Sequence, residues 1–246
     1  MQVHSKVVLV TGAARRIGSA IAKHFHDQGF RVALHYNTSK NEALQLCQSF
    51  ESIRPDSAFC VQADLSKVLD TKAMVQYIKK QWGRLDVLVN NASTYYPIPF
   101  LETTESQFDE LMNSNLKGTY FLCQSAFPLL IESEGSVVNI LDTELDFSYA
   151  GFSAYFVTKS GLHALTRSLA AEFAATLRIN AVSPGMVLLP EKAPLSEDQK
   201  AARIKKIPMG RLGTPEEIAE AVYFMATGPK YITGQILSVD GGRSIA

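Results

Sequence analysis

Two residues spaced four apart, Tyr155 and Lys159, carry side chains suited to proton transfer. In a helix, residues four apart lie on one face, so the phenol and the ammonium can meet. The pKa of an isolated tyrosine is about 10, and a neighbouring positive charge favours the ionised phenolate. The spacing is weak by itself, because Tyr36 and Lys40 share it. The pair predicts a phenol with a lowered pKa that exchanges a proton near neutral pH.

Further polar residues accompany this pair in the sequence. Asp142 follows a predicted strand at 136–141, and the run from Asn90 to Ser93 ends another at 85–90. Asn115 lies in the helical region that comes next. Open α/β sheets bind their ligands at the carboxyl ends of the strands. The candidate catalytic residues are therefore Asp142, Asn115, Tyr155 and Lys159.

A glycine-containing loop at 11–18 joins the first predicted strand to the first predicted helix. Backbone N–H groups at such a helix N-terminus can bind a pyrophosphate. Arg16 stands where the dinucleotide-binding pattern has its middle glycine, so the match to that pattern is imperfect. The candidate cofactor-binding residues of this loop are Gly12, Arg15, Arg16, Ile17 and Gly18.

The end of the second predicted strand indicates which nucleotide is used. Folds that bind NAD carry an acidic residue there, which holds the ribose 2′-hydroxyl. This chain instead has a run without a carboxylate, whose hydroxyl, amide and cationic groups suit a 2′-phosphate: His35, Tyr36, Asn37, Thr38, Ser39 and Lys40. With positive charge added by Arg15 or Arg16, the sequence predicts NADPH as the cofactor.

Short apolar runs alternate with amphipathic stretches along the whole chain, which is typical of βα units in a parallel sheet. Strands are predicted at 7–10, 30–36, 58–61, 85–90, 136–141, 177–182 and 235–239. Helices are predicted at 17–28, 41–52, 68–82, about 104–131, about 154–175 and 215–225. The last helix should begin with a capping box of Thr214 and Glu217. A TIM barrel would need eight comparable repeats and is disfavoured.

The predicted fold is therefore a single α/β domain over residues 1–246. It is a doubly wound, Rossmann-like sheet of seven parallel strands with helices on both faces. The segment 186–210 contains three prolines and a charged middle, and we expect it to form a mobile substrate flap.

Composition excludes several classes of protein. The chain has 246 residues, with 24 basic and 24 acidic side chains, and this balance argues against a nucleic-acid or polybasic membrane protein. It shows neither a transmembrane run nor the sections of a signal peptide, so we expect a cytoplasmic protein. The three cysteines are widely spaced without a CxxC pair, so no metal site is predicted and buried thiols are expected.

Taken together, these features resemble the short-chain dehydrogenase/reductase family across essentially the whole chain. The matching positions include the 11–18 loop, Asp64, Asn90-Asn91-Ala92, Asn115, Tyr155, Lys159, Pro184-Gly185 and the 239–242 run. The resemblance implies that Tyr155 donates a proton, while Lys159 lowers its pKa and holds the nicotinamide ribose. It further implies that Asn115 orients a relay water and that the protein is a homotetramer. Additional cofactor contacts are implied for Asp64, Leu65, Asn91, Ala92, Ser93, Pro184 and Gly185.

Departures from the family pattern indicate one branch of it. Asp142 stands where most members have a serine, and a carboxyl group suits proton transfer toward the nitrogen of a C=N bond. With Arg16 and the 93–97 run, the chain resembles the pteridine reductases. That resemblance implies reduction of a dihydropterin or dihydrofolate substrate, with Tyr95 stacking on the pterin and Arg16 and Ser93 close to it. Thr38 departs from the branch, which often has an arginine there. Val187 departs from the family, which commonly has a hydroxyl residue after Pro184-Gly185.

Two alternatives stay open. One is a carbonyl-reducing member of the same family, such as a 3-oxoacyl-carrier-protein reductase. The other is an NADPH-binding sensor without chemistry, which the presence of Asn115, Tyr155 and Lys159 disfavours.

Overall fold

A computed structural model describes residues 5–146, 149–188 and 196–246 of the chain. Seven strands form one sheet in the order β3, β2, β1, β4, β5, β6, β7, and every neighbouring pair is parallel. The strands are β1 (Val7–Val10), β2 (Arg31–Tyr36), β3 (Ala58–Gln62), β4 (Val87–Asn90), β5 (Ser136–Ile140), β6 (Arg178–Pro184) and β7 (Ile236–Val239). The predicted single-domain doubly wound fold is confirmed.

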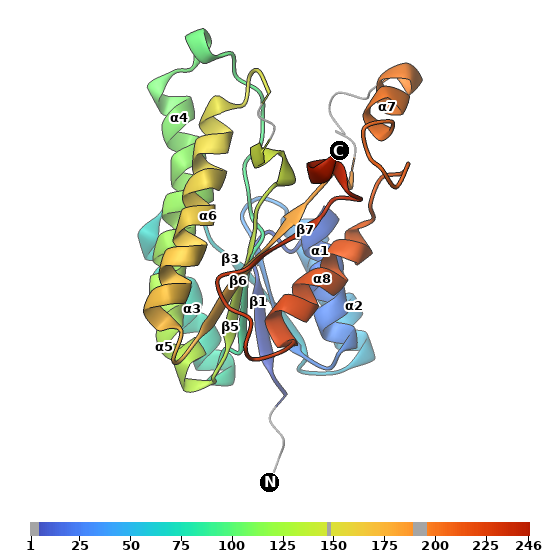
Figure 1. Ribbon diagram of the computed structural model, residues 1–246. Coiled ribbons are helices and arrows are strands. Elements are labelled where there is room, and N and C mark those ends of the chain that lie inside the picture. The colour runs from blue at the N-terminus through green and yellow to red at the C-terminus, as the bar shows by residue number, and fades with distance from the viewer. Residues whose placement is uncertain (1–4, 147–148, 189–195) are drawn as a thin grey trace.

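Helices cover both faces of this sheet (Figure 1). On one face lie α1 (Arg16–Asp27), α2 (Lys40–Ile53) and α8 (Pro215–Thr227); on the other lie α3 (Val68–Trp82), α5 (Gly118–Glu132) and α6 (Ser153–Phe173). In β1, Val8 and Val10 pack into the first layer while Val7 and Leu9 pack into the second. All four are fully buried because helices enclose both faces.

The long helical region predicted at 104–131 is interrupted. It comprises α4 (Glu105–Met112), a π-helical turn η2 (Asn113–Lys117) and α5. Such turns insert one extra residue per turn and are frequent at functional sites. Here the turn contains the buried Asn115.

The segment predicted as a flap contains a helix that the sequence did not predict, α7 (Glu197–Ile204), which a capping box at Ser196 begins. Positions 189–195 of that segment lie outside the described residues, so its mobility stays a prediction. The capping box of Thr214 and Glu217 at the start of α8 is confirmed. Short 3-10 helices complete the described elements: η1 (Phe100–Glu102), η3 (Thr143–Asp146) and η4 (Arg243–Ile245). No helix within the described ranges is long and apolar enough to cross a membrane.

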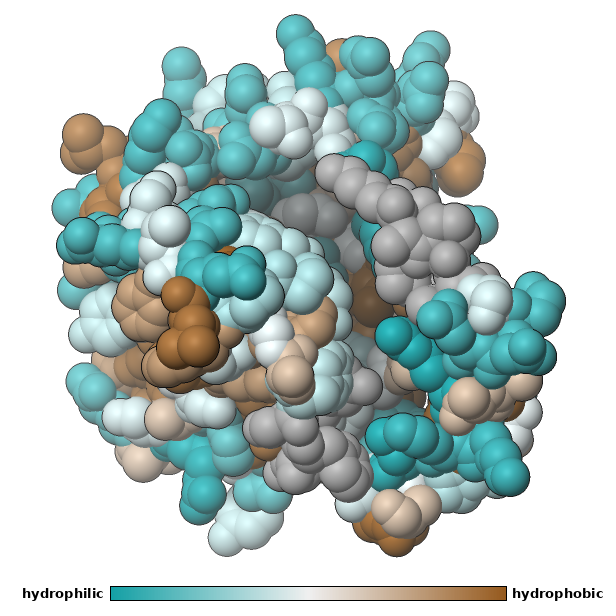
Figure 2. Space-filling model, turned by 90° about the horizontal axis from the view of Figure 1, so that it is seen from above, coloured by the Kyte–Doolittle hydropathy of each residue, from teal (hydrophilic) through white to brown (hydrophobic). Residues whose placement is uncertain are grey.

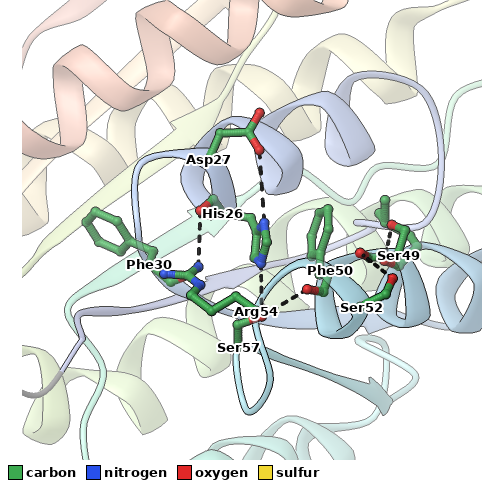
Figure 3. A network of polar contacts seen from close by, with 9 residues as sticks. His26, Asp27, Phe30, Ser49, Phe50, Ser52, Arg54 and Ser57 are labelled. Atoms are coloured by element: carbon green, nitrogen blue, oxygen red, sulfur yellow. Dashed lines mark hydrogen bonds and ion pairs between the residues drawn. The ribbon is translucent and has the colours of Figure 1, made fainter.

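A buried polar network fastens α1, α2 and β3 at the amino end of the sheet (Figure 3). The His26 ring stacks on Phe50 with centroids 4.2 Å apart, and its Nε2 lies 2.9 Å from Ser57 Oγ. Arg54 donates to the backbone carbonyls of His26 and Phe30. Burial, followed by the Arg54 charge, lowers the pKa of His26, although Asp27 acts in the opposite direction. The network stabilises the scaffold with a neutral imidazole.

Candidate active site

The two halves of the sheet diverge between β1 and β4. The chain leaves β1 toward β2 and leaves β4 toward β5, so the loops at the carboxyl ends of β1 and β4 turn in opposite directions. A crevice forms at such a switch point, and ligands bind there in open α/β sheets. Figure 2 looks down on this edge and shows the surface hollowed between its two sides.

In the loop after β1, the backbone packs closely against the start of α1. Gly12 has a φ of 63°, and a Cβ on Gly18 would lie 2.1 Å from the Gly12 carbonyl oxygen, so glycine is required at position 18. Arg16, the first residue of α1, has a φ of 55°, a left-handed conformation that favours glycine. The structure thus explains why the family pattern has glycine there. Arg15 and Arg16 are both exposed beside this turn.

The end of β4 is fastened to the same loop. Thr11 Oγ1 accepts hydrogen bonds from the backbone N–H groups of Asn91 and Ala92 at 2.9 and 3.0 Å. Asn91 Nδ2 donates to the Thr11 carbonyl at 2.8 Å. Asn91 and Ala92 therefore lie at the crevice, and the Asn91 amide group supports the loop. Ser93 follows them and is exposed.

His35, one of the predicted cofactor contacts, uses both ring nitrogens within the protein. It is 2% exposed, its Nδ1 accepts from the Gly12 N–H at 3.1 Å, and its Nε2 donates to the Ala63 carbonyl at 3.0 Å. Burial lowers the pKa of His35 to about 4. A neutral imidazole with both nitrogens engaged has nothing left for a phosphate, so its role is to position the loop. Tyr36 is buried too, which leaves the groups from Asn37 to Lys40 at the surface.

The catalytic side chains predicted from the sequence come together at the end of β5 and the start of α6. The Tyr155 hydroxyl donates a hydrogen bond to Asp142 Oδ2 at 2.9 Å. Lys159 Nζ donates to the Ile140 carbonyl at 2.8 Å and lies 5.8 Å from the centre of the Tyr155 ring. Both Tyr155 and Lys159 are buried, at 5% and 3% exposure.

The pKa of Tyr155 is shifted in the opposite direction to the one predicted from the sequence. The pKa of Tyr155 is raised, first by burial and then by the Asp142 carboxylate, whereas the sequence predicted that Lys159 would lower it. Burial lowers the pKa of Lys159 to about 8, although Asp142 acts in the opposite direction. Burial and the carboxylate that accepts the phenol hydrogen bond therefore both favour the neutral phenol. Tyr155 is kept protonated, as a proton donor must be.

Asn115 positions neighbouring elements. Its Oδ1 accepts from the Thr94 N–H at 2.7 Å and from Ser114 Oγ at 3.1 Å. Its Nδ2 donates to the Thr94 carbonyl at 2.9 Å and to Thr158 Oγ1 at 3.3 Å. An amide has two acceptor sites and two donors, so these four contacts use the whole side chain, and the predicted role in orienting a relay water stays a prediction. Asn115 ties the segment after β4 to α6.

Aromatic side chains form one wall of the site. The half-exposed Tyr95 ring stacks on Phe152, with centroids 4.7 Å apart, and meets the Tyr155 ring edge-on at 4.8 Å. Its hydroxyl lies 3.1 Å from that of Tyr149. Tyr95 was predicted from the sequence, whereas Tyr149 and Phe152 were not, although they precede Tyr155 by only six and three residues.

The remaining predicted residues line the same edge of the sheet. Asp64 follows β3, and hydrogen bonds from Ser66 lower the pKa of its carboxyl group. Leu65 is buried beside it. Pro184 ends β6, and a Cβ on Gly185 would lie 2.6 Å from Asp240 Cα, so the chain passes close to the end of β7. Among the described residues, no group of three or more potential metal ligands occurs.

A cavity of about 1020 Å³ lies next to the site without containing it. It shares Tyr149 with the aromatic wall, and its other lining residues include Phe156, Phe100, Leu101 and Val157. None of Asp142, Tyr155 and Lys159 borders it. The catalytic group therefore belongs to the crevice at the end of the sheet.

Comparison with known proteins agrees with this geometry. A family model described as Enoyl-(Acyl carrier protein) reductase matches residues 12–244. Pteridine reductase 1 of Leishmania tarentolae is 37% identical, over 97% of this chain and 96% of its own length. The 3-oxoacyl-(acyl-carrier-protein) reductase FabG of Staphylococcus aureus is 35% identical, over 97% of this chain and 98% of its own length. The enzyme of the same name from Thermotoga maritima is 32% identical over the full length of both chains. The chain belongs to the short-chain dehydrogenase/reductase family and is an NAD(P)-dependent oxidoreductase.

Proposed function

We propose that this protein is an NADPH-dependent pteridine reductase that converts a dihydropterin or dihydrofolate to the tetrahydro form. The observation that carries the proposal is the 2.9 Å hydrogen bond from Tyr155 to Asp142. Carbonyl reduction develops negative charge on oxygen, which an adjacent carboxylate destabilises. Reduction of a C=N bond instead benefits from a protonated, positively charged nitrogen, which a carboxylate stabilises.

The proposed proton path uses side chains already in contact. The hydride comes from the cofactor when it is bound. Tyr155 donates its proton to the ring nitrogen, and the resulting phenolate lies beside Lys159, whose pKa of about 8 keeps it mostly charged at neutral pH. Asp142 holds the phenol hydroxyl in place and accepts its hydrogen bond between turnovers.

Groups at the crevice fit NADPH. The close packing of Gly18 against Gly12 leaves room for a pyrophosphate at the start of α1. No carboxylate ends β2, and the exposed groups at Asn37, Thr38 and Lys40, with Ser39 half-buried, suit a 2′-phosphate. Nearby Arg15 and Arg16 add positive charge. This supports NADPH over NADH.

The aromatic wall supports a flat substrate. Phe152 covers one side of the Tyr95 ring, and the half-exposed tyrosine presents apolar surface next to the Tyr155 hydroxyl. Planar heteroaromatic rings stack favourably on such surfaces. Arg16 and Ser93, on the neighbouring loops, are the proposed polar contacts of the pterin.

Steady-state NADPH oxidation tests the proposal with dihydrobiopterin, dihydromonapterin and dihydrofolate as substrates. We expect turnover with at least one of them and a large loss in Asp142→Ser. Absence of turnover with all three, or full pterin activity in Asp142→Ser, contradicts the assignment.

The second candidate is a 3-oxoacyl-carrier-protein reductase. It is favoured by the Staphylococcus aureus relative, whose identity of 35% is close to the 37% of the pteridine reductase. Acetoacetyl thioester is its diagnostic substrate, and turnover of that thioester alone selects this candidate. NADPH binding without turnover on either panel would select the sensor alternative instead.

We further propose a homotetramer located in the cytoplasm. Exposed apolar side chains near η1 and α6, such as Phe100, Leu101 and Val157, support association with further copies. Light scattering after size-exclusion chromatography measures the mass of the assembly, and a monomeric mass contradicts this part of the proposal. Cell fractionation tests the location.

A further inference from the structure

Two of the three cysteines lie together between α2 and β3. Cys60 Sγ donates to the Ala43 carbonyl at 3.1 Å, and Ala43 lies one helical turn before Cys47. Both thiols are half-buried and pack against the same core cluster. Because the Ala43 carbonyl also accepts the helical hydrogen bond of the Cys47 N–H, the Cys60 sulfur lies beside the start of the Cys47 side chain. The two side chains thus form a dithiol near the surface.

Cys123 provides the contrast within the same chain. It is 1% exposed beneath α5, and its sulfur accepts a hydrogen bond from Asn90 Nδ2 at 3.4 Å. Burial keeps peroxides away from its sulfur and raises its pKa to about 12, so this thiol is unreactive. The expectation of buried thiols is confirmed for Cys123 and is wrong for Cys47 and Cys60, which are half-buried.

We propose that Cys47 and Cys60 are a redox modification site that hydroperoxides oxidise to a reversible disulfide bond. The Cys47 thiolate attacks one peroxide oxygen, the O–O bond breaks, and a sulfenic acid and one water form. The Cys60 sulfur then attacks the sulfenic sulfur, the S–O bond breaks, and a second water leaves with the Cys60 proton. Overall, two thiols and one hydrogen peroxide give one disulfide and two waters.

The site connects the two elements that hold the segment after β2. Gln62, two residues beyond Cys60 in β3, donates from Nε2 to the Asn37 carbonyl at 3.0 Å. The helix that carries Cys47 begins at Lys40, directly after this segment. A disulfide brings two sulfurs to about 2.0 Å and uses the Cys60 thiol hydrogen, so the two sulfurs must approach each other and the Cys60 bond to Ala43 must break. We expect oxidation to displace residues 37–40.

The disulfide itself does not depend on the proposed function, but its kinetic effect does, because residues 37–40 are the proposed 2′-phosphate contacts. Treating the purified protein with hydrogen peroxide should remove two hydrogen atoms by intact mass, and dithiothreitol should restore them. Peptide mapping should join Cys47 to Cys60. The KM for NADPH should rise several-fold, while kcat at saturating NADPH stays unchanged.

Matched variants complete the experiment. Cys123→Ser should retain the mass loss, and Cys47→Ser and Cys60→Ser should each abolish it along with the change in KM. Oxygen addition at Cys47 without a disulfide, or a disulfide that involves Cys123, overturns the proposal. The intact mass and the peptide map of the oxidised wild-type protein test the disulfide even if a variant does not fold. If the protein shows no turnover with NADPH, the readout in place of KM is amide hydrogen exchange of the peptide that contains residues 37–40. Unchanged exchange after oxidation would then overturn the proposed effect of the disulfide on residues 37–40.

Discussion

At the scale of single residues, Arg16 combines an unfavourable backbone with a proposed ligand contact. Its φ of 55° costs a non-glycine residue roughly 1–2 kcal/mol. We expect Arg16→Gly to be more stable than Arg16→Ala by about 1 kcal/mol in chemical denaturation, because only alanine keeps the strain while both remove the side chain. Both variants should raise the KM for NADPH. Equal stability of the two variants would show that the backbone at this position is not strained.

A second residue-scale prediction concerns Asp142, which raises the pKa of Tyr155 through its charge and its hydrogen bond. Asp142→Asn keeps the size of the side chain and removes the charge, so the pKa of Tyr155 should fall. The charge of Asp142 also raises the pKa of Lys159, so that pKa of about 8 should fall as well. The alkaline limb of the pH profile of kcat should then move to lower pH, and dihydropterin turnover should fall roughly 100-fold. Tyr155→Phe, which lacks the proton donor, should lose turnover altogether. An unmoved alkaline limb in Asp142→Asn contradicts the assignment.

The candidate reacting groups could be predicted from the sequence more readily than the roles of the residues that support them. Tyr155 and Lys159 were found because their spacing places them on one helix face, and Asp142 because it follows a strand. The roles of His35 and Asn115 depend on Gly12, Ala63 and Thr94, which are remote in the chain and approach only through the sheet order. The direction of the Tyr155 pKa was wrong because the prediction considered only the lysine, whereas burial and a carboxylate 2.9 Å away both raise the pKa.

At the scale of elements, the junction of β1 and α1 depends on close packing of the loop against the start of the helix. A Cβ on Gly18 would lie 2.1 Å from the Gly12 oxygen and 2.6 Å from Asn91 Nδ2. Gly18→Ala should therefore lower the free energy of unfolding by about 1–3 kcal/mol and raise the KM for NADPH. Gly213→Ala, whose Cβ would meet nothing closer than 3.4 Å, should change stability by less than about 0.5 kcal/mol. Thermal unfolding compares the two; a similar effect of both would contradict the packing argument.

Elements differ in how far the sequence predicts them. The buried strands and capped helices were predicted because their residues carry the signal themselves, as in Val7–Val10 and the Thr214 capping box. The π-helical turn at Asn113–Lys117 was not predicted, since it comes from tertiary contacts of Asn115 within an otherwise helical pattern. The helix α7 was not predicted because its residues lack a buried apolar face.

At the scale of the whole molecule, a zero net charge hides an uneven distribution of charge. The crevice combines Arg15, Arg16 and Lys40 with a strand end that has no carboxylate, although Glu42 lies 3.6 Å from the Arg15 guanidinium. A neutral protein can therefore attract a polyanionic cofactor locally, because charges beyond about 8–10 Å are screened at physiological salt. Whole-chain charge excluded a polyanion-binding surface and gave no information about this site.

The dependence of the free energy of unfolding on pH is a property of the whole molecule, and we expect His35 to influence it strongly. The pKa of His35 is about 4 in the folded protein, against 6.5 as its ordinary value. Because the folded value is the lower one, its contribution is fully present above pH 6.5 and is lost as the pH falls toward 4. This difference corresponds to about 3 kcal/mol. His26, whose pKa is also lowered, adds to the loss in the same direction.

Replacing His35 by glutamine keeps a donor and an acceptor and removes the titration. Denaturant unfolding between pH 7 and pH 4.5 should show a shallower decline of the free energy of unfolding in His35→Gln than in the wild type, whatever the absolute stability of the variant. His163→Gln, on α6, controls for the loss of an imidazole elsewhere. Parallel declines in wild type and His35→Gln would mean that His35 titrates alike in both states, and its buried contacts to Gly12 and Ala63 would not persist in solution.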